Sequence, residues 1–241
     1  MENYTIPKNL LSPGVTNAKT AKNNLKTFIL YLAPYNQNSK KINICPKASK
    51  GCAASCLFSA GRGSFNSVKN ARTNKTEYYL SDKKTFIQQL AKEILTKHKT
   101  ATKKGEKIAF RLNGTSDLDF IALLKKYASL DIATLSNAVF YDYTKILGKV
   151  KKYIGHKNYF LTFSRAEDNE KETFEALKIG ANVSAVFNVS KENPLPKTYK
   201  GFKVLDGDKF DDLMLTAKNS ILGLRAKGEA IKDKTNFVIN I

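Results

Sequence analysis

The sequence has 241 residues, a hydrophobic content of 42%, an aromatic content of 10% and a formal net charge of +20. A chain of this length and composition folds around a core and is not intrinsically disordered. Its longest apolar runs, such as residues 28–33, are too short to span a bilayer, and residues 1–8 lack an apolar signal core. These features predict a soluble, intracellular protein without a membrane segment.

The high positive charge has two interpretations. It can mark a polyanionic partner, above all nucleic acid. It can also be a solvated surface, because the chain has only five Arg among its 41 basic residues and its Lys are spread along the whole length. We favour the solvated surface and keep nucleic acid as the alternative partner.

Residues 1–26 are polar and predict an arm packed on the domain. Residues 27–32 form an apolar, β-rich run that predicts a buried strand. Two helices follow the cysteine-containing loop, the first at about 65–80 and the second beginning at Ser81, a residue type that caps helix N-termini.

From residue 105 onward, short apolar strands alternate with amphipathic helices. The predicted strands are 107–112, 138–141, 159–163, 183–187, 202–205, 221–224 and 237–239. The predicted helices are 117–130, 145–154, 169–179 and 209–217.

Such alternation predicts an α/β fold with a parallel sheet. With the strand near residue 28 the total is about eight, which favours a small, irregular (β/α)8 barrel of the TIM type, with the cysteine loop after the first strand. An open, doubly wound sheet is the alternative. We find no linker, so we expect one domain over residues 1–241.

All three cysteines lie within twelve residues, as Cys45, Cys52 and Cys56, with the spacing C-x6-C-x3-C. Thiolates grouped in this way usually hold a metal, and three of them suit a [4Fe–4S] cluster with one open iron. Zinc would need a fourth ligand, and neither His98 nor His156 is near in the sequence. The remaining alternative is three buried, inert thiols.

Polar residues follow the predicted strands, at the edge where the functional groups of such folds gather. Because Arg is rare in this chain, its appearance there suggests fork-shaped donors for an anion. The candidate ligand-binding residues are Arg111, Asn113, Asp117, Asp142, Ser164, Arg165, Asp206, Asp208, Arg225 and Lys227.

Several of these motifs resemble the bacteriophage family of gene product 88. The matching stretches include residues 11–14, 44–46, 51–56, 60–63, 111–117, 141–145, 161–165, 206–208 and 223–228. The resemblance implies a phage protein made in the cytoplasm of an infected bacterium.

The order of a first strand, a three-cysteine loop and a barrel also looks like that of radical S-adenosylmethionine enzymes, although those space their cysteines C-x3-C-x2-C. We therefore expect an iron–sulfur protein whose open iron faces the charged pocket and binds a small molecule. This interpretation leans towards an enzyme, with S-adenosylmethionine as a candidate cofactor. The alternative is a nucleic-acid-binding phage protein with a structural metal.

Overall fold

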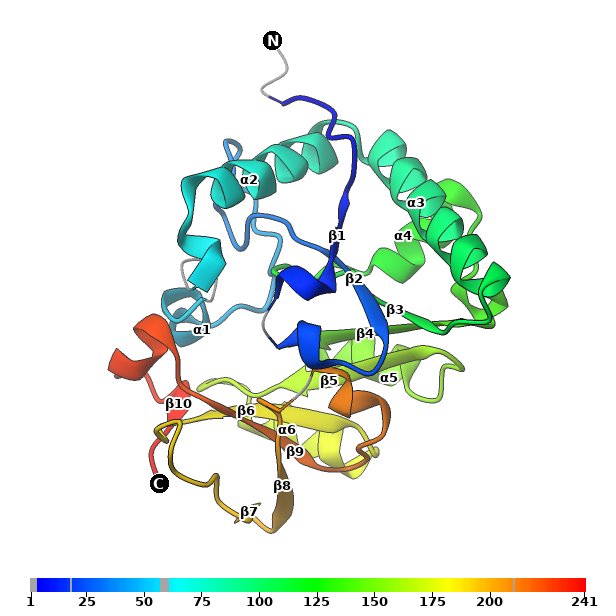
Figure 1. Cartoon of the computed structure of the whole chain (residues 1–241). Coiled ribbons are helices and arrows are strands. Elements are labelled where there is room, and N and C mark those ends of the chain that lie inside the picture. Colours follow the sequence, from blue (N-terminus) through cyan, green and yellow to red (C-terminus); the bar gives the residue numbers. More distant parts are fainter. Residues whose placement is uncertain (1–3, 18, 57–60, 210) are drawn as a thin grey trace.

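The fold is described from a computed structural model, in which residues 4–17, 19–56, 61–209 and 211–241 are placed (Figure 1). Ten strands form its sheet within these ranges. They are β1 (Leu11–Pro13), β2 (Lys26–Leu30), β3 (Ile108–Arg111), β4 (Ala138–Thr144), β5 (Tyr159–Ser164), β6 (Asn182–Phe187), β7 (Thr198–Tyr199), β8 (Phe202–Asp206), β9 (Ile221–Arg225) and β10 (Val238–Ile239).

The strand order is β1-β2-β3-β4-β5-β6-β9-β8-β7, with β10 paired to β6. All strands from β2 to β8 along this path pair in parallel, while β1 and β7 are antiparallel to their neighbours. β6 pairs with β5 through Asn182–Ser184 and with β10 through Val186–Phe187, so the sheet forks at the carboxyl end of β6.

The predicted α/β class is confirmed, but the predicted closed barrel is not. Each outer parallel strand pairs on its free side with a short antiparallel strand, β2 with β1 and β8 with β7, instead of pairing with the other. Closure of a barrel needs its first and last strands to meet. The sheet described here is therefore open.

Six α-helices are found in the described residues, and all except α1 lie close to predicted positions. They are α1 (Lys50–Ala54), α2 (Asn66–Ser81), α3 (Lys83–Lys103), α4 (Phe120–Ala128), α5 (Leu147–Tyr153) and α6 (Glu170–Lys178). The helix predicted at 209–217 is wrong, because the described residues there form a 3₁₀ turn at Asp211–Leu215. The predicted N-cap of α3 was one residue early. Asp82 accepts a hydrogen bond from the Thr85 amide, whereas Ser81 ends α2.

One face of the sheet packs against the helices. Phe28, Phe110 and Phe140 occupy matched positions on β2, β3 and β4, and their rings stack at centroid distances of 5.8 and 5.0 Å. Side chains of α3 at helical spacing, including Phe86, Leu90 and Ile94, join the same cluster. This cluster is the largest part of the core.

The opposite face carries the alternate strand residues and is covered by segments that lie outside the α-helices. Tyr141 and Leu222 pack there against Met214, which belongs to a 3₁₀ turn at Asp211–Leu215. Asn23, from the N-terminal arm, accepts from the amides of Asp211 and Asp212 and donates to the Tyr141 hydroxyl. The arm and the turn thus fill the space that would be the interior of a barrel.

Candidate functional site

A cavity of about 500 Å³ lies at the carboxyl ends of the parallel strands. Five neighbouring strands supply residues to its floor: Arg111 (β3), Tyr143 (β4), Ser164 (β5), Ser184 (β6) and Leu224 (β9). Its size is within the range of about 300–1,000 Å³ that is usual for small-molecule sites. Ligands of parallel α/β sheets bind at this edge.

Three further segments wall the cavity. The cysteine-containing segment contributes from residue 45 to residue 56, and the N-terminal arm contributes Asn17 and Lys19. The C-terminal part contributes Ala230 and Phe237. The lining residues therefore span almost the whole sequence.

Eight of the ten predicted pocket residues line this cavity. They are Arg111, Asn113, Asp117, Ser164, Arg165, Asp208, Arg225 and Lys227. Asp142 and Asp206 are not part of the lining. Asp142 accepts a hydrogen bond from Asn113, and Asp206 accepts one from Arg225, and both of these donor residues do line the cavity. That the eight residues bind a ligand stays a prediction.

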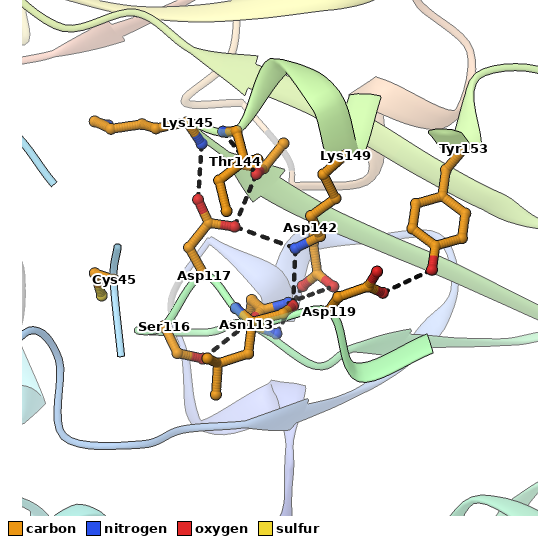
Figure 2. A network of polar contacts seen from close by, with 12 residues as sticks. Cys45, Asn113, Ser116, Asp117, Asp119, Asp142, Thr144, Lys145, Lys149 and Tyr153 are labelled. Carbon is orange, nitrogen blue, oxygen red and sulfur yellow. Dashed lines mark hydrogen bonds and ion pairs between the residues drawn. The ribbon is translucent and has the colours of Figure 1, made fainter. Parts of the chain in front are cut away.

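Asn113 organises the loop that follows β3 (Figure 2). Its side chain accepts hydrogen bonds from the Ser116 hydroxyl and the Leu118 amide, at 2.9 and 2.8 Å. The side-chain Nδ2 of Asn113 donates a hydrogen bond to the Asp142 carboxylate, and the backbone N–H of Asn113 donates a second one at 2.7 Å. Burial raises the pKa of Asp142 to about 6, against the opposing effects of Lys149 and the Asn113 amide.

Gly114 brings this loop against β2. A Cβ at this position would lie 2.6 Å from the Tyr31 ring and 2.8 Å from the Leu30 carbonyl oxygen. Only glycine permits such a close backbone approach. The loop is thus fixed from two sides, by Asp142 and by β2.

Asp117 lines the cavity but its charge is already compensated. It accepts hydrogen bonds from the Thr144 hydroxyl and the Lys145 amide, both at 2.8 Å, and pairs with the buried Lys149 ammonium at 3.1 Å (Figure 2). These contacts connect the loop after β3 to the end of β4. Asp117 therefore has a structural role in this arrangement.

A second buried carboxylate, Asp211, pairs with Arg111 at 3.0 Å and with Lys19 at 3.1 Å. The Arg111 guanidinium also lies over the Tyr143 ring, 5.0 Å from its centroid. Burial alone would raise the pKa of Asp211, but the two cations outweigh it and lower this pKa to about 2. Asp211 is therefore an anion at neutral pH that neutralises part of the wall.

The third acidic group of the wall, Asp208, is also paired. Lys227 contacts it at 2.6 Å, and the Arg225 amide donates to it at 2.9 Å. The Arg225 guanidinium binds Asp206 and the carbonyls of Ser190 and Asn193. Protein acceptors thus occupy the donors of Arg225, which fastens β9 to β8 and to the loop after β6.

Lys145 and Arg165 differ from the other cations of the cavity. Neither forms an ion pair with a carboxylate of the described residues. The Lys145 ammonium lies over the Phe237 ring at 5.5 Å, and Nη1 of Arg165 donates to the carbonyls of Asn236 and Phe237 at 2.6 and 2.7 Å. The two cations thus flank one residue of the C-terminal segment.

The cysteines do not form the predicted metal site. Among the residues that the structure describes, no three His, Cys, Asp or Glu side chains make a group that could hold a metal ion. The prediction of a [4Fe–4S] cluster on Cys45, Cys52 and Cys56, with an open iron for a substrate, is therefore wrong, and the zinc alternative fails on the same finding.

The packing of the chain explains this correction. Cys45 packs against the large cluster beneath the helices, whereas Cys52 packs with Ala166, Ala230 and Phe237 in a separate cluster. The Cys45 sulfur lies 3.8 Å from the Thr115 carbonyl oxygen, as expected for an S–H donor. Burial raises the pKa of Cys45 to about 12, so this thiol stays protonated at neutral pH.

Sequence reasoning missed several residues of the site. Lys19 and Asp211 come from the arm and the 3₁₀ turn, where no strand pattern marks them. Glu167 accepts from the Ser49 hydroxyl and from the Gly51 amide, both at 2.7 Å, and so anchors the start of α1 on the loop after β5. Glu167 follows the predicted strand 159–163 by four residues, and that position was the one available signal.

No helix of the described ranges has the length and apolar character needed to cross a membrane. Comparisons with curated proteins and with solved structures find no match. The model of the family described as gene product 88 matches residues 9–241, nearly the whole chain. The chain therefore belongs to the gene product 88 family of bacteriophage proteins.

Proposed function

We propose that the cavity binds a small anionic molecule. The observation that carries this proposal is the charge of its wall, which has six basic and three acidic side chains. All three carboxylates are engaged by protein cations, whereas Lys145 and Arg165 form no ion pair with a carboxylate in the described part of the chain. The wall of the cavity therefore has an excess of positive charge, which favours a bound anion.

The position of the cavity supports this proposal. The carboxyl edge of a parallel sheet is the usual place for a ligand. Apolar side chains of the lining, Val186, Leu224 and Phe237 among them, offer contact surface for the uncharged part of the molecule. Because the family is one of phage proteins, we expect the ligand to come from the cytoplasm of the infected bacterium.

The test is a thermal-unfolding screen of small anions, with benzoate and phenyl phosphate among them. A ligand at about 100 times its Kd stabilises the folded state by about 2.7 kcal/mol, which raises the Tm of a domain this size by roughly 5–10 °C. At least one anion should produce a saturable shift of this kind. Arg165→Gln should reduce the shift.

The control is Lys125→Gln, which makes the same change in charge at an exposed position of α4 outside the lining. This variant should keep the full shift. If every anion acts equally on the wild type and on both variants, the effect is general screening and the proposed site is wrong.

A further inference from the structure

The hydrogen-bond donors around Lys145 and Arg165 indicate which anion the cavity would hold. A guanidinium has five N–H donors. Arg165 uses Nη1 for the carbonyls of Asn236 and Phe237, which leaves Nε–H and the two N–H groups of Nη2. These remaining donors form the side of the fork that binds two oxygen atoms of one anion at once.

Lys145 adds an ammonium group whose donors form no hydrogen bond with the part of the chain that the structure describes. Within the described residues its Nζ makes no hydrogen bond, and its one contact is with the Phe237 ring. Phe237 thus holds both cations, one over its ring and the other at its carbonyl oxygen. Strand register supports this, because Lys145 and Arg165 directly follow the ends of the paired strands β4 and β5.

The floor beneath them supplies a neutral donor. The hydroxyls of Ser164 and Ser184 lie 3.0 Å apart on adjacent strands, and both residues line the cavity. One hydroxyl donates to the other, so the second proton of the pair remains for a ligand. Together with the two cations, this makes about seven donors on four residues that line the same cavity.

This number of donors exceeds the needs of a carboxylate. A carboxylate group has about four lone-pair sites, whereas a phosphate monoester presents three strongly accepting oxygens and up to two negative charges. We infer that the anionic group recognised at Lys145, Arg165 and the Ser164–Ser184 pair is a phosphate monoester. This inference rests on the proposed function, since it names the class of ligand for the same cavity.

The Phe237, Val186 and Leu224 side chains beside this region favour a phosphate that is attached to an organic group over inorganic phosphate. Two sources share this chemistry: a free phosphorylated small molecule and the terminal phosphate of a nucleic acid. The net charge of +20 would raise the association rate of either.

The experiment is a calorimetric titration of the full chain in 0.15 M NaCl. The matched probes are phenyl phosphate and benzoate, which carry the same ring. Phenyl phosphate should bind at least about tenfold more tightly than benzoate at pH 7.5, and its affinity should fall towards pH 5 as the dianion takes up a proton with a pKa of about 6.

Lys145→Gln should weaken phenyl phosphate binding on the order of tenfold or more, because it removes a charge-assisted donor. Its side-chain nitrogen forms no hydrogen bond with the described protein, so the variant should keep the wild-type Tm. Arg165→Lys keeps the charge but not the fork, and should also weaken binding. Lys125→Gln again serves as the control.

The outcomes separate the two claims. Benzoate binding that equals phenyl phosphate binding and depends on Lys145 would overturn the phosphate inference but leave the anion site intact. If neither probe binds, or if Lys145→Gln changes nothing, both claims fail.

A 5′-phosphorylated oligonucleotide that binds more tightly than phenyl phosphate and than its unphosphorylated form supports the nucleic-acid source. Tighter binding of phenyl phosphate supports the small molecule.

Discussion

At the scale of single residues, Asp142 shows how the fold supports the cavity without lining it. Its carboxyl group is buried, receives two hydrogen bonds from Asn113 and has a pKa raised from 3.8 to about 6. A raised carboxyl pKa means that the folded state holds the proton more tightly than the unfolded chain does. Its contribution to stability is therefore largest at low pH and is lost as the pH rises from about 4 to 6.

The first prediction concerns this titration. Asp142→Asn should lower the free energy of unfolding less at pH 7 than at pH 4.5, and the two costs should differ by about 2 kcal/mol. Urea unfolding of both proteins at the two pH values measures it. Asp168→Asn, which makes the same change at an exposed carboxylate, is the matched control. An equal cost of Asp142→Asn at both values would contradict the raised pKa.

At the scale of elements, helix α1 depends on one glycine. A Cβ on Gly51 would clash with the Thr235 hydroxyl and lie 2.5 Å from Cβ of Phe237. Helix propensity favours Ala over Gly by about 1 kcal/mol, while overpacking costs typically 1–3 kcal/mol. The two atoms that the new Cβ would meet lie close to the backbone and cannot easily move away. We therefore expect the cost of overpacking to exceed the gain in helix propensity.

Gly51→Ala should therefore lower the stability by about 1–2 kcal/mol and weaken ligand binding, because α1 and Phe237 wall the same cavity. Chemical unfolding and the phenyl phosphate titration measure the two effects. Gly148→Ala is the matched control: Gly148 is also helical, in α5, and a Cβ there meets no atom within 4 Å. That variant should be neutral or stabilised. A stabilised Gly51→Ala protein would refute the close packing.

Most of these elements were predictable from local patterns. The run at residues 159–163 identified β5 (Tyr159–Ser164) to within one residue, because an apolar stretch between turn residues marks a buried strand. The short antiparallel strands β1 and β7 carry no such pattern and were missed. Since these two strands occupy the sheet edges, the closure of the barrel could not be judged from the sequence.

The candidate site was predictable only in part. Strand ends place Arg111 and Arg165 at one edge of the sheet, because parallel strands end at the same edge, and both residues line the cavity. Sequence spacing does not determine where thiols point, however, and Cys45 and Cys52 joined different clusters. The contribution of Lys19 depends on the path of the arm across the sheet, which is a tertiary property.

At the scale of the whole molecule, the charge of +20 acts against the folded state. Like charges that are held together in a compact chain repel one another, and salt screens them over about 10 Å at 0.1 M. We expect the Tm to rise between 0.01 and 0.3 M NaCl. Arg165→Gln should show nearly the same rise, since chloride screening does not need the cavity. A Tm that is constant or falls with salt would show that the basic surface is compensated locally.

The wide sequence span of the cavity lining has a consequence for folding kinetics. The wall combines Asn17 and Lys19 with Phe237, so it exists only after contacts between the two ends of the chain have formed. Such long-range contacts close large loops, and they form slowly. A ligand of this cavity binds the native state. It binds the folding transition state only weakly, because the wall of the cavity is still incomplete at that stage. It should therefore slow unfolding much more than it accelerates refolding.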